Sequence, residues 1–274
     1  MDDLYQKIAN EVLSCHLIIE GNIDEVRKNH NATTAINGFK EEEFIVEFIN
    51  SNNQFREKLV KLDSKILLAR YRQLKGTTKI DITNGHTGLQ IKKYKHKIFG
   101  QLDRRPLYSV IHNIPALKKI RKYLQNLFEL ELLSCGKMVD KTQTIVKLTY
   151  DNYSQQELTT IVKIINEQKS KLIEMAFHGF HNKEKPIYLF GIEYKNKQRN
   201  NLIIYKITDI IEYLQKHEFQ IKKSGTVIEL AGCFSIQRKG GDAGKKTSND
   251  MQTKLVFSKL PTDMIKLKFV FPNY

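Results

Sequence analysis

The sequence is poor in cysteine and has no long apolar run, and each absence narrows the class of protein. Its three cysteines lie far apart and form no CxxC pair, which argues against a disulfide framework and against structural zinc. No stretch approaches the roughly 18 apolar residues that a membrane-spanning helix needs. Met1-Asp2-Asp3 lacks the basic start of a signal peptide. We therefore expect a cytoplasmic protein with no membrane partner.

Linkers and repeats are also lacking, because prolines, glycines and serines gather into no linker and no low-complexity tract is present. We therefore expect residues 1–274 to form a single compact unit. Helical periodicity predominates in the first half, around a central hairpin, and strand patterns predominate from about residue 186. This order predicts an α/β fold in which helices flank a mixed central β-sheet. A helix is expected in the opening residues, where Leu4, Ile8, Val12 and Leu13 recur at helical spacing. The other expected helices are 39–73, broken near 51–53, then 107–133, 154–176 and 208–217, and the expected strands are 77–83, 88–95, 188–192, 202–205, 226–231, 233–238, 251–258 and 265–271.

The positive charge is concentrated in two segments rather than spread along the chain. The net charge is +15; residues 88–123, with ten basic groups and one acidic group, contribute +9 of it, and residues 221–274 contribute +6. The remaining residues sum to zero. Concentrated basic patches are typical of a protein that binds a polyanion, above all nucleic acid. A solvated surface or an acidic protein partner is the alternative explanation.

The central hairpin carries the residues that most strongly suggest a chemistry. Asp81 lies on its first strand, and Gln90-Ile91-Lys92 lies on its second. Alternate residues of a strand share a face, so Gln90 and Lys92 point to one side while Ile91 points into the core. Many Mg²⁺-dependent nucleases place an acid on one strand and an acid or amide two residues before a lysine on the next. A structural aspartate followed by an ordinary half-buried strand is the alternative.

In the nuclease interpretation these residues divide the work between metal and substrate. Mg²⁺ prefers hard oxygen ligands, which the Asp81 carboxylate, the Gln90 amide and the Ile91 main-chain carbonyl would supply. Lys92 would position or deprotonate the attacking water, or neutralise charge on the phosphate. A glutamine in place of the usual acid leaves the site one negative charge short. Metal binding should then depend more strongly on the DNA phosphate as an additional ligand.

A third acid is expected from the helix that precedes the hairpin. Glu42 is spaced i, i+3, i+4 and i+7 with Ile45, Val46 and Ile49, so it shares their apolar face. A carboxylate on such a face is costly without a partner, and a metal site would be one. The alternative is that Glu42 belongs to a solvated acidic run at a helix N-terminus, where anions are favoured.

A rival E-x-K pattern is present at Glu193-Tyr194-Lys195. It has the more usual glutamate, but no aspartate lies on a preceding strand. The surrounding residues carry almost no net charge. A salt bridge at the end of a strand explains this pattern equally well, so the hairpin is the favoured catalytic site.

A basic, glycine-rich loop near the C-terminus is a candidate for DNA recognition. Three glycines within residues 240–244 let the backbone approach a surface closely. The polar side chains around them are of the types that read base edges or contact phosphates; a flexible, solvated hairpin tip is the alternative. We expect DNA contacts from this loop, from the strands beside it and from the basic strand and turn after the catalytic hairpin: Lys93, Lys95, Lys97, Gln101, Arg104, Arg105, Gln237, Arg238, Lys239, Asp242, Lys245, Lys246, Thr247, Ser248, Asn249, Gln252 and Lys254.

Taken together, these residues resemble type II restriction endonucleases of the PD-(D/E)XK superfamily, in particular the small enzymes that cut four-base sites such as CCGG or GCGC. The likeness rests on Asp81, Gln90 and Lys92 and on the Met-Gln-x-Lys end of the basic loop, residues 251–254, which follow in the same order. A departure is the absence of the usual proline before the aspartate, where Ile80 stands.

The resemblance implies a fold and a division of the chain. It implies a restriction-endonuclease-like core, with residues 38–135 as the catalytic half that holds the metal hairpin and residues 186–274 as the strand-rich DNA-recognition half. It assigns catalysis to Asp81, Gln90 and Lys92, and base contacts to the stretch 238–254.

The implied activity is sequence-specific, Mg²⁺-dependent cleavage of double-stranded DNA in a prokaryotic restriction–modification system. A cognate methyltransferase would act on the same site without contacting this chain, which would work as a monomer or a homodimer. Two other functions stay open. One is a non-catalytic DNA-binding protein whose hairpin acid is structural, and the other is a nuclease that acts on RNA or branched DNA in repair.

Overall fold

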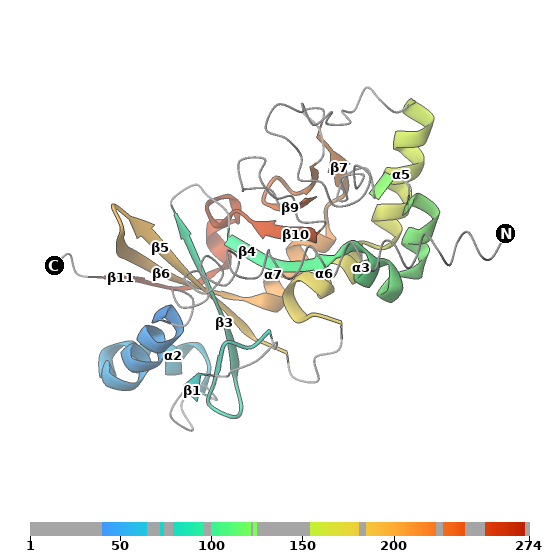
Figure 1. The fold of residues 1–274 in the computed structure, drawn as a ribbon. Coiled ribbons are helices and arrows are strands. Elements are labelled where there is room, and N and C mark those ends of the chain that lie inside the picture. The colour runs from blue at the N-terminus through green and yellow to red at the C-terminus, as the bar shows by residue number, and fades with distance from the viewer. Residues whose placement is uncertain are drawn as a thin grey trace, which may run out of the picture.

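The structure, a computed structural model, describes residues 40–64, 72–73, 79–95, 100–121, 123–124, 154–180, 185–222, 227–238 and 250–271. Two β-sheets form its framework, and strand β3 crosses the centre of the view in Figure 1. Among the described helices, none is both long and apolar enough to cross a membrane.

The first sheet has six strands in the order β1-β2-β3-β5-β6-β11. Strand β3 pairs in parallel with β5, whereas the other neighbouring strands pair antiparallel, so this sheet is mixed. The strands are β1 (Arg72–Gln73), β2 (Ile82–Thr83), β3 (Gly88–Lys95), β5 (Tyr188–Lys195), β6 (Gln198–Lys206) and β11 (Ile265–Val270).

The second sheet has five strands in the order β4-β10-β9-β8-β7, all antiparallel. Its strands are β4 (Gly100–Pro106), β10 (Asp250–Leu255), β9 (Phe234–Arg238), β8 (Ile228–Leu230) and β7 (Phe219–Ile221). The pairing of β10 with β4 is irregular between Thr253 and Lys254, where two residues of β4 oppose one step of β10.

Helices cover both sheets, and local sequence explains where several of them begin. Asn52 separates a helix over 40–51 from α2, and its side chain accepts a hydrogen bond from Phe55 N–H at 2.9 Å. Ser154 and Glu157 form a capping box at the start of α5. The labelled helices are α2 (Asn53–Leu62), α3 (Leu107–Asn113), η2 (Pro115–Ile120), α5 (Gln155–Glu167), α6 (Lys169–His178), α7 (Ile207–Gln215), η4 (Phe257–Lys259) and η5 (Thr262–Met264).

The helices pack against the sheets in two apolar clusters, the second of which also includes Tyr94, Leu189 and Tyr205 of the six-stranded sheet. The helix over 40–51 and α2 contribute Ile45 and Phe55 to an apolar cluster with Ile91 of β3, so they cover one face of the six-stranded sheet. Helices α3, α5 and α6 join a second cluster with the five-stranded sheet, and Figure 1 shows them on the side away from α2. Because Ile91 faces the first cluster, the opposite face of β3 is left for Gln90 and Lys92.

The predicted hairpin is confirmed, and its turn explains why it forms. Strands β2 and β3 pair with Ile82 opposite Leu89. The Asn84 side-chain oxygen accepts hydrogen bonds from the backbone N–H of His86 at 2.9 Å and of Thr87 at 2.7 Å. Gly85 has a φ of +91°, which glycine adopts without a steric penalty. The interactions that form this turn are all local, so the sequence predicts the turn.

Phe257 of η4 packs where the two sheets meet. Its ring stacks on Tyr94 of β3, with the centroids 4.5 Å apart. A methyl group on Gly100 of β4 would come within 2.6 Å of the Phe257 ring, and one on Gly191 of β5 within 3.0 Å. Glycine at these two positions therefore allows one aromatic ring to pack against strands of both sheets.

The predicted fold class, a mixed central sheet flanked by helices, is confirmed. The helix expected in the opening residues lies outside the described residues. Several local predictions are wrong, among them the end of the expected strand 251–258, where residues 257–258 lie in η4. Residues 101–105 form the middle of β4 instead of a turn, because β10 supplies a pairing strand from much later in the chain. Residues 72–73 form β1 instead of the end of a helix. Each sheet also takes strands from both halves of the chain, since β4 joins β10 while β3 joins β5.

Candidate active site

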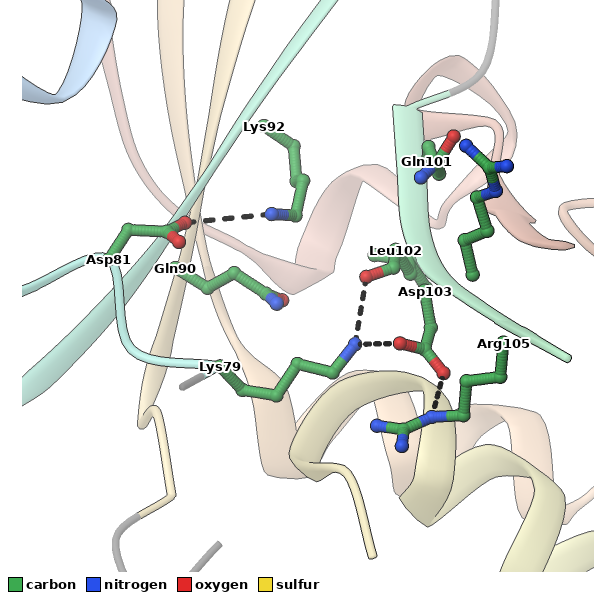
Figure 2. A pocket seen from close by; sticks show the side chains of 9 residues that line it. Lys79, Asp81, Gln90, Lys92, Gln101, Leu102, Asp103 and Arg105 are labelled. Atoms are coloured by element: carbon green, nitrogen blue, oxygen red, sulfur yellow. Dashed lines mark hydrogen bonds and ion pairs between the residues drawn. The ribbon is translucent and has the colours of Figure 1, made fainter. Parts of the chain in front are cut away.

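A cavity of about 380 Å³ opens where the hairpin faces β4. Figure 2 shows the side chains of the hairpin on one wall and those of β4 on the other. The structure thus brings the three predicted catalytic residues of the hairpin together with several of the predicted DNA contacts. The residues that line the cavity are Lys79, Asp81, Gln90, Lys92, Gln101, Leu102, Asp103, Arg104 and Arg105.

Asp81 lies just before β2 and is held in place by the neighbouring strand. Its backbone N–H donates to the Leu89 carbonyl at 2.9 Å, which extends the hairpin pairing by one step. Its Oδ2 accepts a hydrogen bond from Ile91 N–H at 2.6 Å and lies 3.5 Å from the Lys92 ammonium. The side chains of Asp81 and Lys92 are 18% and 20% exposed, so both remain open to the cavity.

Gln90 is the most unusual polar residue of the cavity. It is 1% exposed, and its Oε1 has no hydrogen-bond partner among the described residues. A buried amide oxygen without a partner is costly, so such an atom points to a ligand that is bound in the working protein. In Figure 2 the Gln90 side chain extends into the space between Lys79 and Lys92.

The main-chain carbonyl of Ile91 points to the side of β3 on which Asp81 lies. The N–H and C=O of one strand residue point toward the same neighbouring strand. Ile91 N–H bonds to Asp81, so the Ile91 carbonyl is on the Asp81 side of β3 as well. The predicted geometry of the hairpin is therefore present, with Ile91 itself packed into the apolar cluster on the opposite face.

These donors fit a hard divalent cation such as Mg²⁺. The Asp81 carboxylate and the Ile91 carbonyl lie on the same side of β3, the buried, unpartnered oxygen of Gln90 belongs to the same cavity as Asp81, and all three are oxygen donors. Within the described part of the chain, no group of three or more His, Cys, Asp or Glu side chains is arranged to hold a metal. A cation at Asp81 would therefore take most of its ligands from neutral oxygens, water and substrate.

The sequence patterns did not predict a role in the site for two residues of the cavity wall, Lys79 and Asp103. The Lys79 ammonium lies 2.6 Å from the Asp103 carboxylate, and Arg105 Nε lies 2.5 Å from the other oxygen of the same carboxylate. Burial lowers the pKa of Lys79 to about 8, although Asp103 acts in the opposite direction. The available signal was that Asp103 is the single acid of the basic segment 88–123.

Strands β4, β10 and β9 extend the cavity into a polar surface. Gln252 of β10 lies opposite Arg104 of β4 on one side and Gln237 of β9 on the other. Lys254 lies in the same way between Gln101 and Ser235. The predicted Q-x-K pair therefore shares one face of the sheet, while the alternate residues of β10 turn toward the core. Because Gln101 and Arg104 also line the cavity, this face continues directly from Asp81.

The β10 side chains of this face are packed among their neighbours, whereas Gln101 and Arg104 of β4 are exposed. Gln252 and Lys254 are only 6% and 8% exposed. The Gln252 amide nitrogen donates a hydrogen bond to the Gln101 amide oxygen. Burial lowers the pKa of Lys254. Side chains ordered in this way are pre-organised for a ligand and lose little entropy when it binds.

The structure does not bring Glu42 to the cavity, and the reason is the rotation of its helix. Glu41, not Glu42, lines up with Ile45 and Ile49 at four-residue spacing, and it is the buried acid of this helix. The Glu41 carboxylate accepts hydrogen bonds from Tyr194 Oη at 2.5 Å and from Arg199 Nε at 2.8 Å. It therefore lies on the face of the sheet that the helix covers, away from Gln90.

Two predicted DNA contacts lie on that same covered face of β3. The Lys93 ammonium lies 3.6 Å from Glu41 and 3.9 Å from the centroid of the Tyr194 ring. Lys95 follows two residues later and is exposed. Alternation along the strand directs both away from Lys92. They do not line the cavity, whereas Gln101, Arg104 and Arg105 do.

The rival pattern has a structural partner of its own. The buried Glu193 carboxylate accepts hydrogen bonds from the side-chain amides of Asn200, at 2.9 Å, and Asn201. It does not line the cavity, and Lys195 is exposed. Arg238 ends β9, and the remaining predicted DNA contacts lie outside the described residues: Lys97, Lys239, Asp242, Lys245, Lys246, Thr247, Ser248 and Asn249.

A scan against protein-family models and a search of curated protein sequences give no match to this chain. A search of solved structures gives a similarity to the restriction endonuclease MspI, in a crystal structure with its cognate DNA. The TM-score is 0.48 and the sequence identity 12%, over 78% of this chain and 87% of that chain. A likeness at this level assigns the chain neither to a family nor to an activity.

Proposed function

We propose that this chain is a sequence-specific, Mg²⁺-dependent endonuclease that cleaves double-stranded DNA in a restriction–modification system. One observation carries the proposal: a single cavity joins Asp81, Gln90 and Lys92 to a sheet face of side-chain types that read DNA bases. The two basic segments supply the charge for phosphate contacts. The enzyme would act as a monomer or homodimer, in a cell whose methyltransferase protects the same site.

Each residue of the hairpin has a part in hydrolysis of the phosphodiester. Asp81, Gln90 Oε1 and the Ile91 carbonyl would hold Mg²⁺, which polarises the phosphate and lowers the pKa of a bound water. The Lys92 ammonium, beside Asp81, would hold a non-bridging phosphate oxygen and neutralise the charge that develops there. A water oxygen forms the new bond to phosphorus as the bond to the 3′ oxygen breaks. The products are a 5′-phosphate and a 3′-hydroxyl.

Incubation with unmethylated plasmid or phage DNA, with and without Mg²⁺, tests the proposal. We expect discrete fragments that require Mg²⁺, and sequencing of their ends gives the target site. A smear without discrete fragments would favour a repair or structure-specific nuclease. Binding without cleavage in any divalent metal would contradict the nuclease proposal and leave a DNA-binding protein.

Gln90→Glu is expected to reduce the Mg²⁺ requirement. The substitution adds a negative charge beside Asp81, so the Mg²⁺ concentration for half-maximal cleavage should fall roughly tenfold. Gln90→Leu, which removes the oxygen but keeps a similar volume, should raise it. Cleavage rates measured across a Mg²⁺ titration for the three proteins check this, and three superimposable titrations would remove Gln90 from the metal site.

Gln252→Ala is expected to relax sequence specificity. A side-chain amide that pairs with a base contributes about 1–3 kcal/mol of discrimination, so the preference for the target over sites that differ by one base pair should fall roughly 10–100-fold. Cleavage rates on short duplexes with single base changes measure it. Gln220→Ala, an exposed glutamine on β7 at the far edge of the same sheet, is the matched control and should keep full discrimination. Equal discrimination by the two variants would argue against a recognition role for β10.

A further inference from the structure

Lys79 connects the segment that carries Asp81 to the sheet that carries the polar recognition face. It lies two residues before Asp81, yet its side chain extends across the cavity to β4, as Figure 2 shows. The Lys79 ammonium donates to the Asp103 carboxylate at 2.6 Å, to the Leu102 carbonyl at 3.0 Å and to the Ala176 carbonyl at 3.2 Å. An ammonium has three hydrogens, and each has an acceptor here.

The strand that Lys79 contacts is fixed from its other side as well. Arg105 binds the second oxygen of Asp103, and its guanidinium lies 5.0 Å from the centroid of the Phe180 ring. Asp103 therefore joins Lys79, β4 and the end of α6 in one buried cluster. Arg104, the next residue along β4, and Gln101, two residues before Asp103, also line the cavity, next to the polar face.

A buried ion pair of this kind contributes little net stability, because the cost of removing both charges from water offsets their attraction. Lys79 and Asp103 are each about as buried as core residues, at 9% exposure. Apolar residues of similar size would fill the same space at least as favourably. The benefit of the cluster is therefore geometric: hydrogen bonds of fixed direction set the distance between Asp81 and β4.

From this arrangement we infer that Lys79 is a positioning residue that couples base recognition on β4 and β10 to catalysis at Asp81. The inference rests on the proposed function. DNA bound to the polar face contacts Gln101 and Arg104 of β4. Asp103 lies on the same strand and is hydrogen-bonded to Lys79, so the position of β4 determines the position of Lys79. Lys79 in turn fixes the position of the Asp81 segment. Lys79 itself touches no reacting atom.

The double variant Lys79→Met/Asp103→Leu tests this role without leaving either member of the Lys79–Asp103 pair buried alone; Arg105 loses Asp103 as a partner but is 25% exposed and can be solvated. We expect the unfolding midpoint and the affinity for target DNA to change little, while kcat falls roughly 10–100-fold, as for other groups that orient a catalytic residue. The ratio of cleavage at target and single-mismatch sites should fall as well. Lys266→Met is the matched control, because it breaks a 2.7 Å ion pair with Asp209 that is remote from the cavity.

A readout that needs no activity separates this inference from the proposed function. The Ile91 N–H is bonded to Asp81, so its hydrogen exchange reports whether Asp81 stays in place. We expect exchange at Ile91 to accelerate at least about tenfold in the double variant, with the amide of Phe190 in β5 unchanged. If the wild-type protein fails to cut DNA but Ile91 behaves in this way, the proposed function is wrong while Lys79 still holds the Asp81 segment in place. Unchanged exchange together with unchanged kcat, or a kcat loss that follows the unfolding midpoint, would overturn the positioning role.

Discussion

Asp81→Asn is expected to lower the rate of DNA cleavage by at least about 10³-fold, since it removes the hairpin carboxylate that would bind the cation. The amide keeps the volume of the side chain, and its oxygen can still accept the hydrogen bond from Ile91 N–H. The fold should therefore be unchanged. The affinity for DNA, measured without divalent metal, should stay within about threefold of the wild-type value. Single-turnover cleavage and a binding titration on the same duplex measure the two quantities separately.

Lys92→Met should reduce the rate of DNA cleavage roughly 10²–10⁴-fold. The substitution removes a positive charge that would stabilise the transition state but keeps the apolar part of the side chain. The matched control for Asp81→Asn is Asp209→Asn. Asp209 pairs with Lys266 far from the cavity, so this variant should cleave DNA at the wild-type rate. If Asp81→Asn cuts normally and Glu193→Gln does not, the catalytic site lies at the rival pattern. Full activity in both variants would exclude both carboxylates.

The hairpin could be predicted from the sequence because the interactions that form it are local. Asn84 and Gly85 set the turn, and the alternation from Gln90 to Lys92 sets the faces of the strand. Nothing beyond the hairpin is needed to place Gln90, Ile91 and Lys92 correctly. The same reasoning explains why the predicted catalytic residues of the hairpin, Asp81, Gln90 and Lys92, line one cavity in the structure.

Strand β4 could not be predicted, because its partners come from distant parts of the chain. Asp103-Arg104-Arg105 has the composition of a solvated turn, and the burial of Asp103 is compensated by ion pairs with Arg105 and with Lys79, which comes from the segment before β2. The strand pairing itself depends on β10, more than a hundred residues later. Sequence patterns report local periodicity, so they identify neither Lys79 as the partner of Asp103 nor β10 as the partner of β4.

The choice between Glu41 and Glu42 shows the same limit at the scale of one residue. Both acids are adjacent to the apolar face of their helix, and a 3.6-residue repeat does not separate them. The distinction comes from Tyr194 and Arg199, which bind Glu41 from β5 and β6. A buried carboxylate on this helix was a sound expectation, but its partner is a structural hydrogen-bond network instead of a metal.

Phe257→Ala is expected to have the largest effect on stability, about 3–5 kcal/mol, as for other fully buried aromatic residues. The ring is 2% exposed, stacks on Tyr94 and packs against Gly100 and Gly191, so its loss leaves a cavity where the two sheets meet. The thermal midpoint should fall by roughly 10 °C. Calorimetry or circular dichroism on the purified variant measures this shift.

The position of Phe257 also predicts a loss of activity that a comparable core residue would not cause. Phe234 is equally buried but packs within the five-stranded sheet and its helices, against Phe177 and Phe219. Phe234→Ala should therefore cost similar stability, yet cut DNA at nearly the wild-type rate well below its unfolding midpoint. Phe257→Ala should cut more slowly under the same conditions, because β4 and the hairpin can shift relative to each other and Asp81 no longer meets the phosphate that β4 presents. Equal cleavage rates for the two folded variants would show that packing between the sheets does not set the geometry of the site.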